Sequence, residues 1–269
     1  CLLGIEAFLA NPKEKTYKLR EIEAANSLAS SLGERIRIGL IALSTDVAIE
    51  HELHRLFPDV TISGSTTRIK LEVPNSHASF AKLESELHGI TDYLIPSSRL
   101  DAVVFGCTSA SAIIGHKKVE QIIRSHLPDV KVVTPIDAVG NALKHLNVAR
   151  LGVIAPYTAS LTETVIAYIE NYGVEVIDAA CFGLNRDEDI ARVPPDLIRE
   201  QVKRMSSENV DAIFVTCTAL EIVSIIEELE QLAGMPILTS NQAVFWHTLK
   251  QCEWTHDIVG FGHLLRRVD

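Results

Sequence analysis

The chain has 269 residues, of which 47% are hydrophobic and 22% are charged, and its formal net charge at pH 7 is −10. This composition is ordinary for a globular protein, and the acidic balance argues against a broad nucleic-acid surface. No uninterrupted apolar run approaches the length of a membrane-spanning helix, about 18 residues or more, so we expect no membrane span.

The cysteines point to a reducing compartment rather than to a disulfide framework. Five of them occur, an odd number with no regular spacing, no CxxC motif and no secretory signal pattern. Because disulfides persist mainly in oxidising compartments, we predict a cytoplasmic location. The chain starts at Cys1 rather than at Met, which leaves open whether the native amino terminus is present.

An amphipathic helix is predicted near the beginning of the chain, over residues 14–32. Leu19, Ile22 and Leu28 fall near one face of this helix, and Gly33 ends it. We therefore expect the first 34 residues to form a helical extension that packs on the main body or on a second subunit.

From residue 35 onward, apolar runs typical of buried parallel strands alternate with helical periodicity. In the first half, strands are predicted at residues 37–42, 60–71, 101–107 and 131–134, and helices at 47–56, 79–91, 108–126 and 135–146. In the second half, strands are predicted at 150–155, 174–181, 211–217 and 236–239, and helices from 158, over most of 187–207, after Cys217 and over 240–250. A break of the second strand at Gly64 is left open, and residues 253–269 carry no clear pattern.

The second half of this alternation repeats the first. Residues 150–155 are identical to residues 37–42 at four of six positions, and residues 211–219 match residues 101–109 at four of nine. Alternation of this kind predicts parallel sheets covered by helices. We expect an α/β fold with two pseudo-symmetric Rossmann-like lobes, each built on a parallel four-stranded sheet, with a ligand cleft between them.

Each repeat places a cysteine where a predicted strand ends and a predicted helix begins. Cys107 follows the first such strand, Thr108 and Ser109 after it can cap a helix, and Cys217 occupies the equivalent place 110 residues later. Ligands bind at this edge of open α/β sheets, and a helix amino terminus favours anions and lowers the pKa of a thiol. A lone cysteine of this kind is commonly a buried structural residue, but two at equivalent places indicate a functional pair.

Small hydroxyl side chains follow four of the predicted strands. They can donate hydrogen bonds to carboxylates, or they can simply cap the helices. The residues are Ser44 and Thr45, Thr108 and Ser109, Thr158 and Ser160, and Thr218.

Several common site motifs are absent from the chain. It contains no GxGxxG, GxxxxGKS/T or GxSxG sequence, which argues against dinucleotide, P-loop nucleotide and α/β-hydrolase sites. His51 and His54 are three apart on a predicted helix, but no carboxylates or cysteines follow at matching spacing, so no metal site is predicted.

Two thiols that face each other across a small cleft suit cofactor-independent chemistry on carbon. One thiolate can take a proton from one face of a carbon acid while the opposing thiol gives a proton to the other face. Alternatively, one thiolate adds to an activated double bond while the other thiol handles the proton. Neither reaction needs a metal or an organic cofactor, and nearby donors stabilise an enolate-like carboxylate.

At these residues the sequence resembles the Asp/Glu racemase superfamily, and within it the branch of maleate cis–trans isomerases and arylmalonate decarboxylases. The resemblance covers residues 35–250 and rests on the two Cys-Thr motifs and on residues 39–50, Ala155-Pro-Tyr157-Thr, Gly183-Leu-Asn185-Arg and Thr239-Ser-Asn-Gln242. In that branch the decarboxylases keep only the second cysteine and have Gly at the first. Both cysteines are present here, so the resemblance favours the isomerases.

The resemblance implies a role for each matched residue. Cys107 is similar to the nucleophile of the isomerases and Cys217 to their proton-handling partner, while Tyr157 and Asn185 would hold substrate carboxylates. Further donors are implied at Thr108, Ser109, Thr218 and Ala219. The resemblance also implies that the last helix crosses back to the first lobe, which divides the chain into a first lobe of residues 35–134 plus 239–269 and a second lobe of residues 135–238.

One position departs from the isomerase pattern. The segment after the first strand is Leu43-Ser44-Thr45-Asp46, whereas the isomerases have Pro-Ser-Ser-Asn, in which the Asn binds a substrate carboxylate. A carboxylate at this position would repel a dicarboxylate unless Asp46 is protonated. We hypothesise that Asp46 meets a substrate ammonium; the alternative is that it only caps the following helix. Ser44 is predicted to bind the substrate through its hydroxyl.

The sequence therefore predicts a cofactor-independent, two-cysteine isomerase of a small carboxylate, similar to maleate cis–trans isomerase. The first alternative is a racemase that uses the same thiols on an Asp- or Glu-type amino acid, or on an ectoine-derived one, because some ectoine-utilisation proteins resemble this family. The second alternative is a non-catalytic sensor of a small carboxylate. We expect a homo-oligomer, and neither nucleic acid nor a membrane as a partner.

Overall fold

The structure is a computed structural model that describes residues 20, 35–57, 61–94 and 100–266. The elements of the first half are β1 (Ile36–Leu43), α2 (Ile49–Leu56), β2 (Ile62–Ile69), α3 (His77–Ile90), η2 (Thr91–Tyr93), β3 (Ala102–Gly106), α4 (Thr108–Ile114), α5 (His116–His126), β4 (Lys131–Val133) and α6 (Pro135–His145). Those of the second half are β5 (Arg150–Tyr157), α7 (Ala159–Glu170), β6 (Glu175–Leu184), α8 (Asp187–Ile190), α9 (Pro195–Met205), β7 (Ala212–Val215), η3 (Val223–Ile225), α10 (Ile226–Ala233), β8 (Ile237–Thr239), α11 (Ser240–Gln251) and η4 (Leu264–Arg266). Apart from residue 20, the helix predicted over residues 14–32 lies outside the described residues.

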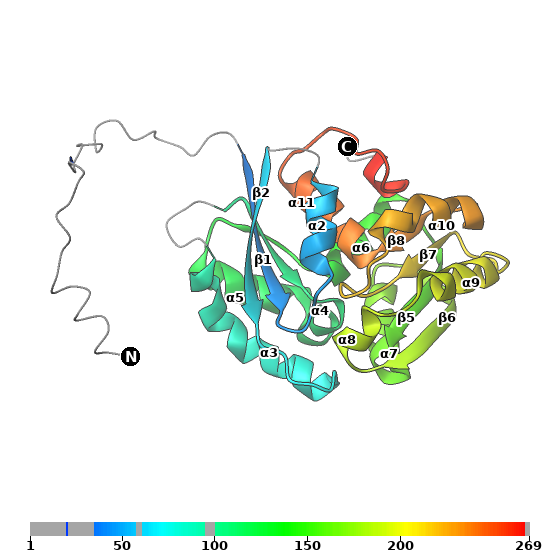
Figure 1. The fold of residues 1–269 in the computed structure, drawn as a ribbon, viewed down its shortest axis with the longest axis horizontal. Helices are drawn as coiled ribbons and strands as arrows, with labels where there is room; N and C mark the ends of the chain where they lie inside the picture. Colours follow the sequence, from blue (N-terminus) through cyan, green and yellow to red (C-terminus); the bar gives the residue numbers. More distant parts are fainter. Residues whose placement is uncertain (1–19, 21–34, 58–60, 95–99, 267–269) are drawn as a thin grey trace, which may run out of the picture. The chain divides into compact units, whose positions relative to one another are not determined.

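Two parallel sheets form the framework (Figure 1), and both have the same strand order. The order is β2-β1-β3-β4 in the first sheet and β6-β5-β7-β8 in the second, and every neighbouring pair is parallel. The predicted α/β fold with two four-stranded parallel sheets is therefore confirmed. β2 is continuous through Gly64, which pairs with Ile38 of β1, so the strand has no break there.

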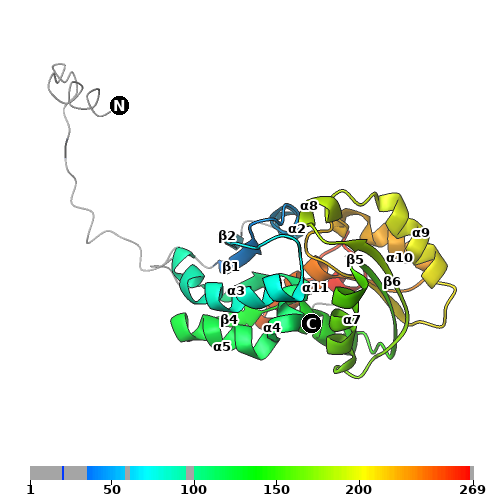
Figure 2. The same cartoon turned by 90° about the horizontal axis from the view of Figure 1, so that it is seen from below.

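Helices cover the sheets and explain the apolar strand sequences. Figure 2 shows α3, α4 and α5 side by side along the first sheet, with α7 next to α4. Every residue of the inner strands β3 and β7 is buried, as expected for parallel strands covered on both faces. β6, an edge strand, alternates instead between exposed and half-buried residues.

The repeated Arg and Asp residues join the starts of neighbouring strands in each sheet. The backbone N–H of Arg37 donates to the Asp101 carboxylate at 2.8 Å. In the second sheet the backbone N–H of Arg150 donates to Asp211 at 2.8 Å, and its guanidinium donates to the same carboxylate at 2.7 Å. These bonds lower the pKa of Asp211 to about 2. The repeated sequence thus fixes the register at equivalent places.

Substitution of Asp211 by alanine is expected to lower the free energy of unfolding by about 1–2 kcal/mol, because the backbone N–H groups of Ala149 and Arg150 lose their acceptor. Urea unfolding would measure this loss. Alanine at Asp257, an exposed residue, is the control and should change the free energy by less than about 0.5 kcal/mol. Equal effects of the two substitutions would contradict a role of Asp211 in joining the strands.

α11 connects the two halves of the chain. It begins directly after β8 of the second sheet, yet it packs against α2, α6, β3 and β4. Its start is fixed by a capping box, in which the Thr239 hydroxyl accepts from the backbone N–H of Gln242 at 3.1 Å. Phe245, Trp246 and Leu249 on this helix are almost completely buried. Residues 35–269 form one compact unit, and the lobe boundaries given above stay a prediction.

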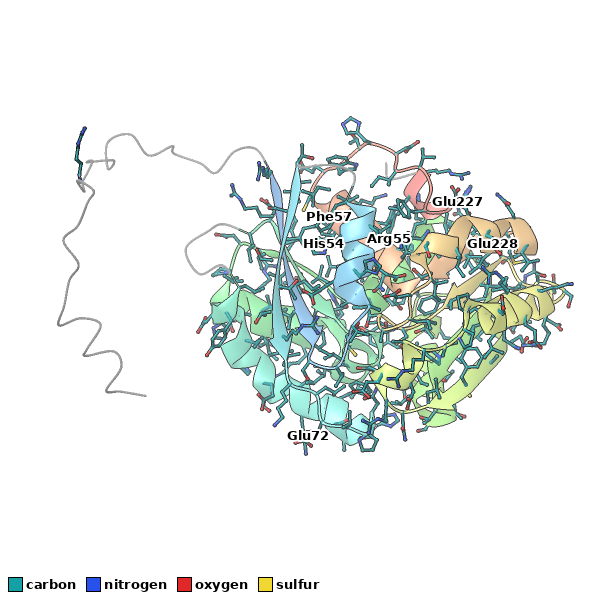
Figure 3. All side chains as sticks on the ribbon, in the orientation of Figure 1. His54, Arg55, Phe57, Glu72, Glu227 and Glu228 are labelled. Carbon is teal, nitrogen blue, oxygen red and sulfur yellow. The ribbon has the colours of Figure 1, made fainter. Side chains whose placement is uncertain are left out.

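Ion pairs lie mainly at the surface. Glu72 pairs with Lys82 at 2.5 Å, and Glu228 of α10 pairs with Arg199 at 2.6 Å; both glutamates are labelled in Figure 3. Exposed pairs of this kind contribute little to stability, about 0–1 kcal/mol each. None of the helices in the described part of the chain combines the length and the apolar character needed to cross a membrane.

Candidate active site

Cys107 and Cys217 lie just beyond the carboxyl ends of β3 and β7 and are only 5% and 6% exposed. The Ser240 hydroxyl at the start of α11 links the two strand ends. It accepts a hydrogen bond from the backbone N–H of Cys217 at 3.1 Å and from the Thr108 hydroxyl at 2.9 Å. A second link runs from the Thr218 hydroxyl to the backbone carbonyl of Gly106, at 3.3 Å. The two halves therefore meet at the cysteines, and the region around both thiols is closed.

Cys107 itself caps α4. Its backbone is extended, and its Sγ accepts a hydrogen bond from the backbone N–H of Ala110 at 3.4 Å. The sequence suggested that Thr108 and Ser109 would cap this helix, but they form its first turn. The sulfur thus lies at the helix amino terminus, as predicted, and takes up one of its N–H groups.

Cys217 is not followed directly by a helix, so that prediction is wrong. Its φ is +103°, in the region that favours glycine, and helical structure resumes only at Val223. This backbone conformation turns the chain away from a helical path immediately after β7. The two cysteines are therefore equivalent in their place at the sheet edge but not in their local geometry.

Burial makes both thiols weaker acids than an ordinary cysteine. It raises the pKa of Cys107 and of Cys217, and the nearby carboxylates of Asp187 and Asp46 raise both further. The N–H of Ala110 on Cys107 acts in the opposite direction, but burial outweighs it. At Cys107 the helix terminus therefore lowers the thiol pKa as expected, but burial outweighs this effect and the net shift is upward. A bound group that offsets this environment would favour the thiolate.

Two buried carboxylates lie close enough to the thiols to raise their pKa values. Asp46 is 1% exposed, and its Oδ1 accepts from the backbone N–H groups of Ala48 and Ile49 at 2.8 and 3.0 Å. It therefore caps the start of α2, while burial raises its pKa to about 6. Asp187 of α8 is 5% exposed and accepts from the Thr45 hydroxyl and from Asn75. The site is thus rich in negative charge.

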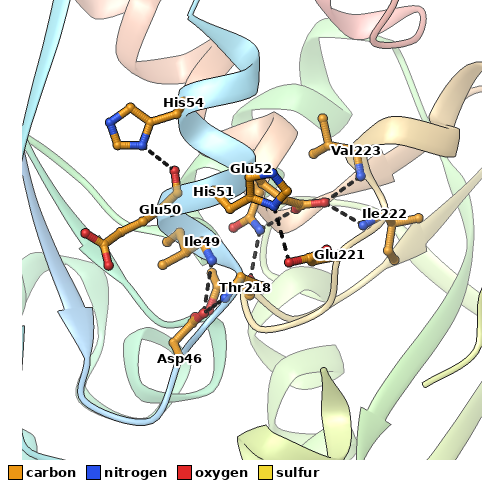
Figure 4. A network of polar contacts seen from close by, with 12 residues as sticks. Asp46, Ile49, Glu50, His51, Glu52, His54, Thr218, Glu221, Ile222 and Val223 are labelled. Atoms are coloured by element: carbon orange, nitrogen blue, oxygen red, sulfur yellow. Dashed lines mark hydrogen bonds and ion pairs between the residues drawn. The ribbon is translucent and has the colours of Figure 1, made fainter. Parts of the chain in front are cut away.

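A third buried carboxylate holds the turn that follows Cys217 (Figure 4). Oε1 of Glu52, on α2, accepts from the backbone N–H groups of Ile222 and Val223 at 2.5 and 2.7 Å. Its Oε2 accepts from Asn241 at 2.6 Å, and Asn241 also donates to the backbone carbonyl of Thr218 at 2.9 Å. Burial raises the pKa of Glu52 to about 7. Glu52 therefore positions the turn from a helix of the other half.

The remaining predicted residues fall into two groups. The first group is buried near the thiols and consists of Tyr157, Ser109 and Ala219. The Tyr157 hydroxyl lies 3.2 Å from the Thr216 hydroxyl, whereas the Ser109 hydroxyl has no partner among the described residues. Ser44 and Asn185 are exposed. The Ser44 hydroxyl accepts from the backbone N–H of Leu71 at 3.1 Å, and the Asn185 carbonyl accepts from that of Asn75 at 2.8 Å. The structure does not bring these last two side chains to the thiols, and their role stays a prediction.

Four polar residues of the site were not predicted from the sequence: Glu52, Asn75, Asp187 and Ser240. Two of them lie in or next to sequence motifs that the resemblance had already identified. Ser240 is inside the Thr239–Gln242 motif that supports the resemblance, and Asp187 follows the Asn185 motif by two residues. Among residues 35–57, 61–94 and 100–266, no group of three His, Cys, Asp or Glu side chains is placed to hold a metal ion.

Comparison with known proteins places this arrangement in a family. Residues 38–265 match the family model described as arylmalonate decarboxylase. The chain belongs to the arylmalonate decarboxylase family. The resemblance described above implies that the decarboxylases lack the first cysteine and that the isomerases have both. Membership of the family therefore does not by itself identify the reaction.

Several relatives of this family member carry the name maleate isomerase. The Nocardia farcinica protein is 22% identical over 242 residues, which are 86% of this chain and 96% of that protein. The crystal structure of the maleate isomerase Iso from Pseudomonas putida S16 has a TM-score of 0.80 at 20% identity and covers 87% of this chain and 99% of that chain. The structure of a cysteine-to-serine mutant of the Nocardia farcinica maleate cis–trans isomerase, with a covalently bound succinylcysteine intermediate, has a TM-score of 0.80 at 23% identity. It covers 87% of this chain and 99% of that chain. At these identities the structures show a shared fold.

Proposed function

We propose that this chain is a cofactor-independent isomerase that uses Cys107 and Cys217 for cis–trans isomerisation of a small unsaturated carboxylate. The observation that carries the proposal is the pair of buried thiols at the ends of β3 and β7, two strand ends that the Ser240 hydroxyl links. The relatives named maleate isomerase support the reaction class, and the succinylcysteine in one of their structures supports a covalent step at cysteine.

The reaction begins from the thiolate of Cys107. Its sulfur forms a bond to one carbon of the double bond while the π bond breaks, and the adjacent carbon takes the proton of the Cys217 thiol. Rotation about the new carbon–carbon single bond follows. The Cys217 thiolate then removes a proton from the same carbon, the double bond forms again, and Cys107 leaves as a thiolate. Both thiols return to their starting states, so no cofactor is consumed.

The substrate carboxylate needs hydrogen-bond donors as negative charge develops on it. The Ser109 hydroxyl is 2% exposed and has no partner among the described residues, so it can donate. The Tyr157 hydroxyl is a second donor, because it is close enough to both cysteines for their charges to affect its pKa. We assign the carboxylate next to the reacting carbon to these two hydroxyls.

Incubation with maleate is expected to produce fumarate, which proton NMR distinguishes from maleate by its olefinic signal. A Cys181→Ala variant is the matched control, because Cys181 is an exposed free cysteine on β6 and should keep full turnover. The chain without any addition of metal or cofactor should be active. Absence of fumarate, with the folded protein present in excess, would contradict maleate as a substrate.

Racemisation by the same two thiols is the second candidate. The observation that favours it is the pair of buried carboxylates, Asp46 and Asp187, which suits a substrate ammonium better than a dicarboxylate. In D₂O, loss of the α-proton signal of D- or L-aspartate would establish this reaction, whereas a constant signal would exclude aspartate as its substrate. The homo-oligomer and the cytoplasmic location stay predictions.

A further inference from the structure

Asp46 has one carboxylate oxygen without a hydrogen-bond donor. Its Oδ1 takes both N–H groups at the start of α2, and its Oδ2 is buried with no hydrogen-bond partner among the described residues. The hydroxyl of Thr218 lies beside Asp46 (Figure 4) and lowers the pKa of this carboxyl, but it donates to the Gly106 carbonyl. An acceptor that is 99% buried therefore remains available beside the thiols.

A second available acceptor adjoins Asp187. The Asn75 amide donates through Nδ2 to Asp187 Oδ1 at 2.7 Å, and its own Oδ1 is buried without a partner among the described residues. Rotating the amide by about 180° would be unfavourable, because its carbonyl oxygen would then face the Asp187 carboxylate. Asp187 in turn raises the pKa of both thiols and of Asp46, so these groups lie together.

Two cationic side chains close to these residues have other partners: Arg68, which is bonded to the backbone of Asp46, and Arg186, which precedes Asp187 in sequence. The Arg68 guanidinium donates to the backbone carbonyls of Leu43 and Asp46 and pairs with Glu50. Arg186 pairs with Glu188 at 3.8 Å. In the part of the chain that the structure describes, no ion pair involves the carboxylate of Asp46 or that of Asp187. A buried carboxylate normally has a partner, so a ligand is the natural source of the missing positive charge.

We propose that Asp46, Asp187 and Asn75 form an ammonium subsite, so that the substrate carries an ammonium group at one end and a carboxylate at the other. The inference rests on the proposed function, because it concerns the substrate of the same two thiols. An ammonium has three N–H donors and no acceptor. These match Asp46 Oδ2, Asn75 Oδ1 and a remaining lone pair of Asp187, whereas a second substrate carboxylate would meet only acceptors there.

An ammonium in this subsite also accounts for thiol activation. The charges of Asp46 and Asp187 raise the pKa of Cys107 and Cys217 in the closed site. A bound ammonium offsets these charges and favours the thiolate with which the reaction begins, whereas a dicarboxylate adds to the repulsion. Substrate binding and activation of the nucleophile are therefore coupled.

Two saturated ligands separate binding from turnover. Succinate and 4-aminobutyrate share a four-carbon chain and one carboxylate, and they differ only in carrying a second carboxylate or an ammonium. Neither has a double bond to which a thiolate can add. By isothermal titration calorimetry near pH 7.5, 4-aminobutyrate is expected to bind about 100-fold more tightly than succinate, since reversing a charge beside a buried carboxylate has an effect of this order.

Asp46→Asn tests the residue directly. Asparagine keeps the oxygen that accepts the two N–H groups at the start of α2, so the variant should fold, which its thermal unfolding checks. It is expected to remove most of the preference for 4-aminobutyrate, and Asp187→Asn should act in the same direction. Glu228→Gln removes one negative charge from the surface, far from this chemistry, and should leave the preference unchanged. An unaltered preference in both aspartate variants would overturn the assignment.

The unsaturated pair, cis-4-aminobut-2-enoate and maleate, then separates failure of the subsite from failure of the proposed function. Conversion of the amino compound to its trans isomer, faster than that of maleate to fumarate, is the expected result. Tighter binding of succinate, or no binding of either saturated ligand, would overturn the subsite even if maleate is isomerised. Selective binding of 4-aminobutyrate without isomerisation of either unsaturated compound would uphold the subsite and overturn the proposed cis–trans isomerase.

Discussion

Replacement of Cys107 or Cys217 by alanine is expected to lower turnover by about 10²–10⁴-fold or more, the range that positioned acid–base groups contribute. Loss of Cys107 removes the sulfur that forms the bond to carbon, and loss of Cys217 removes the proton that completes the addition. Because the two thiols act in one sequence of steps, the double variant should be little worse than either single variant. Initial rates by proton NMR, with whichever unsaturated carboxylate the wild-type protein converts, would measure all three.

The cysteine variants also distinguish an enzyme from a sensor. Both thiols are small, buried groups, so their replacement by alanine should leave ligand affinity within about tenfold of the wild-type value. In Cys217→Ser, reversal of the addition is slowed, and mass spectrometry should find a substrate adduct on the peptide that contains Cys107. If both alanine variants keep full turnover, or if no turnover is found while binding persists in every variant, the two-thiol mechanism is wrong.

Glu52 is expected to make the protein less stable as the pH rises. Burial raises its pKa in the folded protein to about 7, from an ordinary value of 4.5, so folding favours the protonated form. The stability from this preference is fully present below the unfolded pKa of 4.5 and is lost as the pH rises through 7. The difference between these pKa values corresponds to about 3 kcal/mol. Asp46, with a pKa raised to about 6, adds a loss of the same sign.

Glu52→Gln removes the first of these titrations. Urea unfolding near pH 5 and near pH 8 should show that the variant loses about 2.5 kcal/mol less than the wild-type protein between the two conditions. The comparison is made within each protein, so any fixed cost of placing an amide against Asn241 does not enter it. The exposed Glu228→Gln variant should follow the wild-type profile. An identical pH dependence in Glu52→Gln would show that this carboxyl titrates normally.

The sequence was sufficient for the framework and for the two cysteines of the candidate site. Strands β3 and β7 are apolar throughout because helices cover both their faces, and that pattern is visible in the chain. The cysteines could be found because the repeat displays them twice. Local signals of this kind arise from neighbours along the chain, which is why the order of strands and helices was predicted correctly.

The turn after Cys217 could not be predicted, because residues far away in the chain determine it. Glu52 holds the backbone of Ile222 from 170 positions earlier, and in sequence it is one more charged residue of an amphipathic helix. Asp187 likewise meets Thr45 across 142 positions. Each contact exists only after the two halves have met, so neither leaves a local pattern.

At Cys217 the backbone conformation favours glycine, whereas the proposed chemistry requires a thiol. With φ at +103°, this position suits glycine, and a side chain there costs of order 1–3 kcal/mol. Selection for a more robust fold alone would therefore drift toward glycine and discard the thiol in doing so. The proposed function requires a thiol at this position despite that cost, so residue 217 is the first position to compare among related chains of unknown activity.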